Sequence, residues 1–155
     1  MIHLICLGNA LHSDDGFGTA LYYTLSRLDW PVGVRVLDGT GRHGGLTLFE
    51  HCERAIVLEA LPPCCGAPGQ VVRLADTDYP QEPQGMAVGT GPLLAAVRRI
   101  IHPAPQVELL GPVSVSRIPY SPGLTPLVAA AVETVVAMLV KELGGRRRKR
   151  RRLSA

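Results

Sequence analysis

Three acidic residues, Asp15, Asp38 and Glu59, stand where carboxylates could act together. Each follows a short apolar run that is typical of a buried parallel strand, either directly or in the loop after it. Because the carboxyl ends of parallel strands meet at one edge of a sheet, we expect the three carboxylates to gather there. Carboxylates held together repel one another, so they need a cation or shared protons. The pattern therefore favours a metal site of hard oxygen ligands.

A purely structural interpretation of the same acids stays open. Asp15 could act as a first-turn acid that favours the start of a helix, and Asp38 could stabilise the turn that continues at Gly39. Spacing alone supports the metal site and the structural interpretation about equally.

The element that must position Asp15 is the stretch from Leu4 to Gly18. Its apolar run at residues 4–7 predicts a buried strand, a turn follows at Gly8, and residues 15–28 predict a helix with one apolar face. Glycine on either side of the loop lets the backbone approach a ligand closely. The stretch is therefore a strand–loop–helix unit whose acids lie at the carboxyl end of the strand, where ligands bind in open α/β sheets.

The rest of the chain continues the alternation of strands and helices. Further strands are predicted at residues 34–37, 55–58, 70–74 and 106–110, and helices at 46–51, 92–101 and 126–143. Thr125 is the predicted N-cap of the last helix, Pro126 its first residue, and Gly144 ends it. The alternation predicts a three-layer α/β/α sandwich with a mostly parallel sheet.

Charge is distributed unevenly along the 155 residues, which suit one domain at residues 1–144. Seven of the 16 basic residues lie at 146–152, and the remaining nine face 13 acidic ones, a net charge of about −4. An acidic body with 5% aromatic residues is not typical of a nucleic-acid-binding protein. We expect residues 145–155 to be a basic tail disordered by self-repulsion, with a contact to nucleic acid or anionic lipid as the less favoured alternative.

The four cysteines point to a reducing compartment. The sequence shows no secretory signal, no apolar run long enough to span a membrane, and no CxxC pair typical of a zinc site. We therefore expect a cytoplasmic protein with free thiols.

Other catalytic motifs do not match. The glycine spacing after the first strand is not GxGxxG, which makes a Rossmann-like nucleotide-binding module the weakest hypothesis, and neither GxSxG nor HExxH occurs. His43, in the glycine-rich loop after the second strand, is a candidate ligand or substrate contact, although a lone loop histidine is more often neither.

Three motifs in the same order closely resemble the [NiFe]-hydrogenase maturation endopeptidases. They are Gly8-Asn9-x-Leu11-x-x-Asp14-Asp15-Gly16-x-Gly18, Leu37-Asp38-Gly39-x-Gly41 and Gly123-Leu124-Thr125-Pro126. The resemblance implies a single α/β domain with a twisted five-stranded sheet. It also implies an endopeptidase that recognises nickel in the precursor of a hydrogenase large subunit and removes the C-terminal peptide of that precursor.

The resemblance also assigns site residues. It places the family's two acidic metal contacts at Asp15 and Glu59, where the family usually has aspartate at the second position. Our own hypothesis is that Asp38 positions the substrate or supports those contacts. The family's third contact is a histidine, but this chain has Met86 there, a soft thioether that suits divalent nickel poorly.

Three explanations of Met86 remain open. His43, Cys64 or Cys65 could supply the missing ligand, or the nickel could be held mainly by cysteines of the precursor. Alternatively, the chain could be a non-catalytic maturation chaperone that binds the large-subunit precursor without cutting it.

Overall fold

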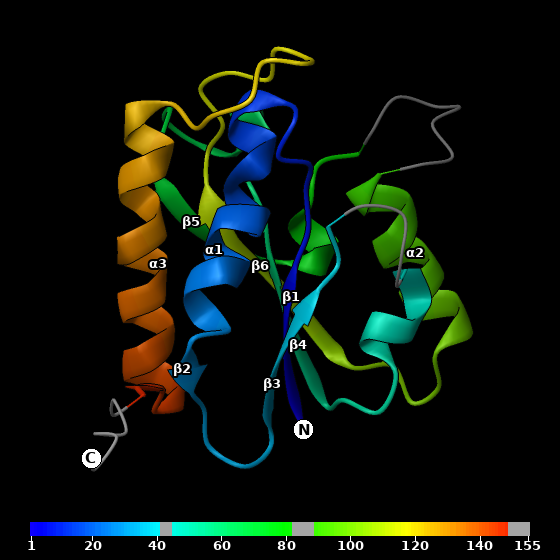
Figure 1. The fold of residues 1–155 in the computed structure, drawn as a ribbon. Helices are drawn as coiled ribbons and strands as arrows, with labels where there is room; N and C mark the ends of the chain where they lie inside the picture. The colour runs from blue at the N-terminus through cyan, green and yellow to red at the C-terminus, as the bar shows by residue number, and fades with distance from the viewer. Residues whose placement is uncertain (41–44, 82–88, 149–155) are drawn as a thin grey trace, which may run out of the picture.

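A five-stranded, mostly parallel sheet forms the centre of the computed structural model, which describes residues 1–40, 45–81 and 89–148 (Figure 1). The strand order is β3-β1-β4-β6-β5, with β5 antiparallel to β6 and the other neighbours parallel. The strands are β1 (Ile2–Cys6), β3 (Val34–Asp38), β4 (Arg54–Leu58), β5 (Val71–Ala75) and β6 (Gln106–Pro112).

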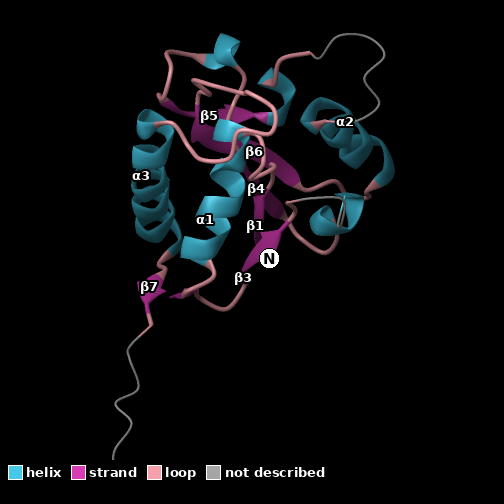
Figure 2. Ribbon diagram, turned by 45° about the horizontal axis from the view of Figure 1, so that its top comes forward, coloured by secondary structure: helices cyan, strands magenta, loops and turns pink. Residues whose placement is uncertain are grey.

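Helices cover both faces of the sheet. α1 (Phe17–Leu25) and α3 (Pro126–Leu143) lie on one face, and α2 (Thr90–Ile100) lies on the other (Figures 1 and 2). Two apolar clusters fill the gaps, one between the sheet and the α1–α3 pair and one between the sheet and α2. The predicted three-layer α/β/α sandwich with a mostly parallel five-stranded sheet is thus confirmed.

The central strands are buried on both faces, which explains why they are continuous apolar runs in the sequence. Leu4 and Ile5 of β1 and Ile56 and Val57 of β4 are fully buried. α1 packs closely on the chain after β1, because a Cβ at Gly18 would overlap the backbone of Leu7. The path from β1 into α1 is therefore fixed by backbone contact.

α3 begins at Pro126 and ends at Leu143, as predicted, and Gly144 follows in the left-handed conformation with φ of 79°. Thr125 is its N-cap residue, but its side chain makes no capping hydrogen bond. Instead the hydroxyl of Thr125 donates to the carboxylate of Asp14. The helix start is therefore tied to the loop after β1.

The first helix is shorter than the predicted span of residues 15–28. The chain forms a 3₁₀ turn at Ser13–Gly16, α1 ends at Leu25, and Leu28 belongs to β2 (Leu28–Asp29). The indole of Trp30 donates to the carbonyl of Leu25 at 3.0 Å, which satisfies a backbone group that the ended helix leaves open.

The expectation that residues 145–155 are disordered is wrong for its first part. Arg146–Arg147 form β7, which pairs antiparallel with β2, and Arg148 makes an ion pair with Asp29 at 3.0 Å. Gly145 is buried against the ring of Trp30. Backbone pairing and an opposite charge thus overcome the self-repulsion of these arginines, whereas residues 149–155 lie outside the described part of the chain.

Within residues 1–40, 45–81 and 89–148, no helix combines the length and the apolarity needed to cross a bilayer.

Candidate active site

The sequence-predicted acids lie at one edge of the sheet. β1 is flanked by β3 and β4, and the register places Cys6 beside Asp38 on one side and beside Leu58 on the other. Glu59 directly follows Leu58. The loops after β1, β4 and β6 all emerge at this carboxyl edge, at the top of Figure 1.

Asp15 sits over the end of β1. Its backbone carbonyl accepts the N–H of Asn9 at 2.9 Å, and its carboxyl group lies beside Gly8. Any Cβ at Gly8, whose φ is +132°, would overlap that carbonyl oxygen. Burial raises the pKa of the Asp15 carboxyl above its usual value, and the nearby Arg117 and His12 side chains offset only part of this effect.

Glu59 extends from the end of β4, the strand next to β1. It is 6% exposed, and Thr90 at the start of α2 donates its hydroxyl to Oε2 at 2.8 Å. The backbone of Glu59 lies against Gly111 of β6. A Cβ at position 111 would overlap the carbonyl of Glu59, so glycine permits this close approach. The two acids that the family resemblance assigns to metal therefore belong to adjacent strand ends.

Asp38, at the end of β3, is exposed and accepts the backbone N–H of Thr40 at 3.0 Å. This is the turn geometry that the structural interpretation predicted for this residue. β1 separates Asp38 from Glu59, so the two residues lie about 10 Å apart across two strand spacings.

The sequence did not indicate the role of Asp14. Its carboxylate is fully buried and accepts the backbone N–H groups of Val115 and Ser116, each at 2.9 Å, and that of Thr125 at 2.8 Å. Burial raises the pKa of Asp14, but these hydrogen bonds outweigh it and hold the pKa below its usual value. Asp14 thereby fastens the β6–α3 loop, residues 113–125, to the loop that carries Asp15.

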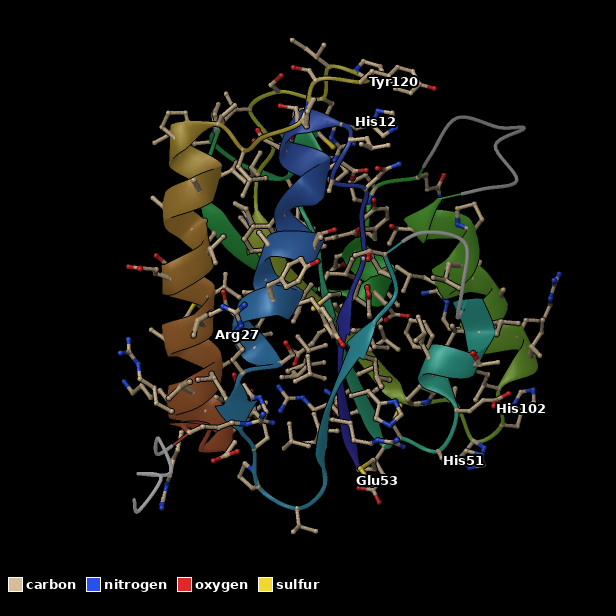
Figure 3. All side chains as sticks on the ribbon, in the orientation of Figure 1. His12, Arg27, His51, Glu53, His102 and Tyr120 are labelled. Atoms are coloured by element: carbon tan, nitrogen blue, oxygen red, sulfur yellow. The ribbon has the colours of Figure 1, made fainter. Side chains whose placement is uncertain are left out.

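Two further residues at this edge were also missed. Arg117 of the β6–α3 loop donates from Nη2 to the carbonyl of Ala60 at 3.2 Å, directly after Glu59. The backbone N–H of Tyr120 donates to Nδ1 of His12 at 3.2 Å, and the two rings meet edge to face at 5.2 Å (Figure 3). Neither has a sequence signal, because each depends on a contact between distant segments.

Two of the alternative ligands, Cys64 and Cys65, lie in the described part of the chain. Cys64 is exposed, and burial together with the neighbouring Cys64 raises the pKa of the Cys65 thiol. All four cysteines are free. Met86 and His43 lie outside the described residues, and no three His, Cys, Asp or Glu side chains within the described ranges form a group that could hold a metal ion.

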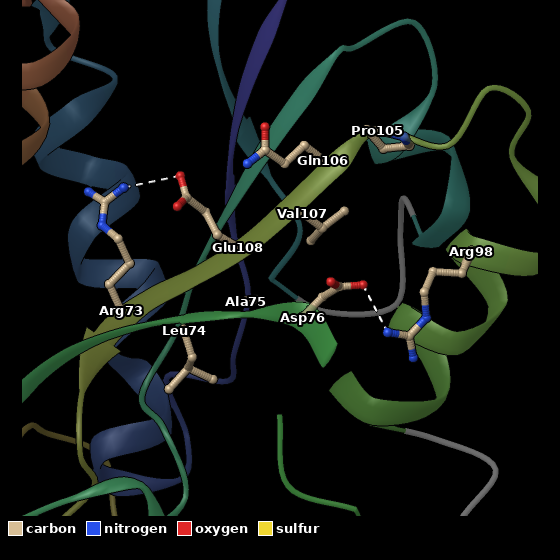
Figure 4. A pocket seen from close by; sticks show the side chains of 9 residues that line it. All are labelled: Arg73, Leu74, Ala75, Asp76, Arg98, Pro105, Gln106, Val107 and Glu108. Carbon is tan, nitrogen blue, oxygen red and sulfur yellow. Dashed lines mark hydrogen bonds and ion pairs between the residues drawn. The ribbon is translucent and has the colours of Figure 1, made fainter. Parts of the chain in front are cut away.

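A pocket of about 480 Å³ lined by residues of β5, β6 and α2 is not part of this edge (Figure 4). It opens beside Gln106, where β6 begins, so it lies at the amino end of that strand. Its charges neutralise one another, since Arg73 pairs with Glu108 at 3.1 Å and Arg98 with Asp76 at 3.0 Å. The candidate active site is therefore the carboxyl edge.

The sequence of residues 21–142 matches the family model described as hydrogenase maturation protease (HycI). The chain belongs to the hydrogenase maturation protease family. Asp14 and Asp15 precede the residues that the family model matches. For the segment that carries them, the similarity to this family therefore rests on the structural comparisons.

Known proteins of this family resemble the chain over most of its length. The hydrogenase expression/formation protein HupD of Rhodobacter capsulatus is 28% identical over 88% of this chain and 68% of its own. The hydrogenase 2 maturation peptidase of a Thaumarchaeota archaeon is 28% identical, with a TM-score of 0.67 over 92% of this chain and 97% of its own. The hydrogenase maturating endopeptidase HybD of E. coli has a TM-score of 0.75 at 24% identity over 94% of each chain.

Proposed function

We propose that this protein is an endopeptidase that removes the C-terminal peptide from the precursor of a [NiFe]-hydrogenase large subunit, guided by nickel that the precursor carries. Family membership supports the peptidase activity, and similar proteins are named maturation peptidases. The observation that carries the proposal is the position of Asp15 and Glu59 on adjacent strand ends at one open edge.

The two carboxylates suit a metal ion that arrives with the substrate. Burial disfavours the charged form of Asp15, and a divalent cation beside it would offset that penalty. Glu59 is held in place by the hydroxyl of Thr90 and is nearly buried. A peptide bond near such an ion would be held close and polarised, since a bound metal acts as a Lewis acid and lowers the pKa of an attacking water.

Other residues have supporting roles in this proposal. Asp38, fixed by the turn at Thr40, lies on the far side of β1 and positions the substrate from there. In this proposal the precursor's own ligands complete the coordination of nickel, because within the described residues no three His, Cys, Asp or Glu side chains form a group that could hold the ion.

A processing assay tests the proposal. Purified protein is mixed with nickel-loaded or nickel-free precursor, and the mass of the precursor's C-terminal fragment is measured. We expect cleavage only of the nickel-loaded form, and none with Asp15→Asn or Glu59→Gln. Glu53→Gln, which alters an exposed acid at the opposite edge of the sheet, is the matched control and should cleave normally (Figure 3).

The same assay separates the endopeptidase from the chaperone. A precursor that binds tightly but keeps its full mass would overturn the peptidase proposal in favour of a non-catalytic chaperone. If the nickel-free precursor is cleaved as fast as the nickel-loaded one, the peptidase proposal stands and only the role of nickel is overturned.

A further inference from the structure

The β6–α3 loop exposes apolar side chains beside the candidate active site. Val115 is 46% exposed, Ile118 60% and Tyr120 82%, and all three fall within six consecutive residues. Leu11, 56% exposed, lies next to His12, whose ring contacts Tyr120. Isolated exposed apolar residues are ordinary, but a group of them in one loop at a functional edge indicates a binding surface.

This loop is held in place rather than exposed by disorder. The Asp14 carboxylate accepts the N–H groups of Val115 and Ser116, and the N–H of Ser13 donates to the carbonyl of Ser121 at 2.8 Å. At the tip, the N–H of Tyr120 donates to His12. A surface that is already ordered loses little conformational entropy when a partner binds.

Arg117 lies in the middle of the exposed group. Within the described residues its guanidinium makes one hydrogen bond, to the carbonyl of Ala60, and no ion pair. Its positive charge acts on Asp15, where it offsets part of the rise in pKa that burial causes. Arginine has five N–H donors arranged to hold a carboxylate through two bonds at once, so most of its binding capacity remains available.

We propose that residues 115–120 form the docking surface for the large-subunit precursor, in which Val115, Ile118 and Tyr120 contact apolar side chains of the precursor and Arg117 binds a carboxylate near the scissile bond. This inference rests on the proposed function, because it names the substrate-binding surface of that same site. An apolar peptide segment with an acidic group is the chemistry that this surface complements.

Two other occupants fit less well. A stable dimer buries roughly 800 Å² per partner, whereas a transient contact with a substrate can be much smaller, so a surface of a few side chains suits a substrate better than a second copy of the chain. One arginine is also far short of the about four to eight basic residues that recruit a protein to anionic lipid. The precursor, by contrast, must reach this edge of the sheet to be cut.

The apolar part of the surface is tested with Ile118→Ser and Tyr120→Ser. Because both side chains are exposed, the variants should fold normally, and each should raise the KM for nickel-loaded precursor roughly tenfold with kcat unchanged. Val32→Ser is the matched control, since Val32 is fully exposed in the β2–β3 turn at the opposite edge. An unchanged KM in both loop variants would overturn the proposal.

The role of Arg117 is tested with Arg117→Gln and Arg117→Lys. Arg117→Gln should raise KM roughly tenfold, and Arg117→Lys should restore only part of the affinity because an ammonium group cannot bind a carboxylate through a planar fork. Acidic residues of the precursor near the scissile bond are then changed to amides one at a time. One of these changes should raise KM for the wild type but not for Arg117→Gln; equal effects on both proteins for every acid would exclude the carboxylate contact.

Binding is measured separately from cleavage, so that the two proposals fail in different ways. If the wild type binds nickel-loaded precursor without cutting it and the loop variants bind about tenfold more weakly, the docking surface stands and the peptidase activity does not. If all variants cleave with wild-type KM, the peptidase stands and the docking surface is wrong. A wild type that sediments as a dimer, with monomeric Tyr120→Ser, would assign the surface to a second copy instead.

Discussion

Asp14 and Asp15 are neighbours in the chain, yet their carboxylates have opposite surroundings. Asp14 is surrounded by N–H and O–H donors that favour its charged form, whereas burial disfavours the charge of Asp15. Asp14 is a structural anchor, whereas Asp15 is the carboxylate that meets the cation in the proposed function. Substitution of each by asparagine should separate the two roles.

We expect Asp14→Asn to destabilise the fold by about 3 kcal/mol, because an amide nitrogen would face backbone N–H donors that are left without an acceptor. Asp15→Asn should keep the stability of the wild type and lose processing. Urea unfolding and the processing assay measure the two effects. Equal loss of stability in both variants would contradict the division of roles.

The stability difference at Asp14 should depend on pH. A carboxylate whose pKa is lowered in the folded state stabilises the fold above its unfolded pKa, and this contribution is lost as the pH falls through the folded value. The difference between wild type and Asp14→Asn should therefore narrow below about pH 4. Unfolding curves recorded at several pH values check this; a difference that does not change with pH would count against it.

Precursor binding should also weaken on acidification, for a reason that lies in Asp15. In the proposed function the carboxylate form of Asp15 contacts nickel, and the raised pKa of Asp15 means that protonation begins at a higher pH than for an ordinary aspartate. The Kd for nickel-loaded precursor should rise as the pH falls from about 7.5 to 4.5. Asp15→Asn, weak throughout, should lack this dependence, and an identical profile in the variant would rule Asp15 out as its source.

At the scale of elements, four charged side chains connect the sheet to α3. Arg54 of β4 and Arg73 of β5 both bond to Glu108 of β6 and to Glu142 near the end of α3. Burial raises the pKa of Glu142, but the two arginines outweigh it and keep this pKa below its usual value. The network lies away from the candidate active site, so its role is structural.

We expect Glu142→Gln to lower the free energy of unfolding by about 1 kcal/mol, the upper range for a partly exposed ion-pair network, and to leave processing unchanged. Glu133→Gln is the matched control, because Glu133 is an exposed acid on the same helix. Thermal unfolding at low and high salt measures the effect, which should shrink as salt screens the charges. Equal stability of the two variants would show that the network contributes nothing.

At the scale of the whole molecule, residues 145–148 pack as part of the fold. β7 pairs with β2, Gly145 packs on Trp30, and Arg148 meets Asp29. A chain that ends at Gly144 should be less stable than one that ends at Arg148 by about 1 kcal/mol, since it loses the hydrogen bonds of this strand pair.

The two truncated proteins can be compared through a natural probe. Trp30 is the only tryptophan of the chain, and Gly145 lies against its ring, so its fluorescence should shift toward that of a more exposed indole when residues 145–148 are removed. Identical spectra and identical unfolding curves for the two chains would contradict the pairing of β2 with β7.

Local sequence patterns were enough to predict the layers of this protein, the bounds of α3, and the edge at which Asp15 and Glu59 lie. These features follow from local information: apolar runs make strands, proline and glycine mark the ends of a helix, and parallel strands end at one edge. The roles of Asp14, Arg117 and Arg146, by contrast, are visible only in the folded chain. Asp14 bonds to residues 101 to 111 positions away, and no local pattern encodes which distant backbone N–H groups a carboxylate will meet, because that depends on how the loops pack.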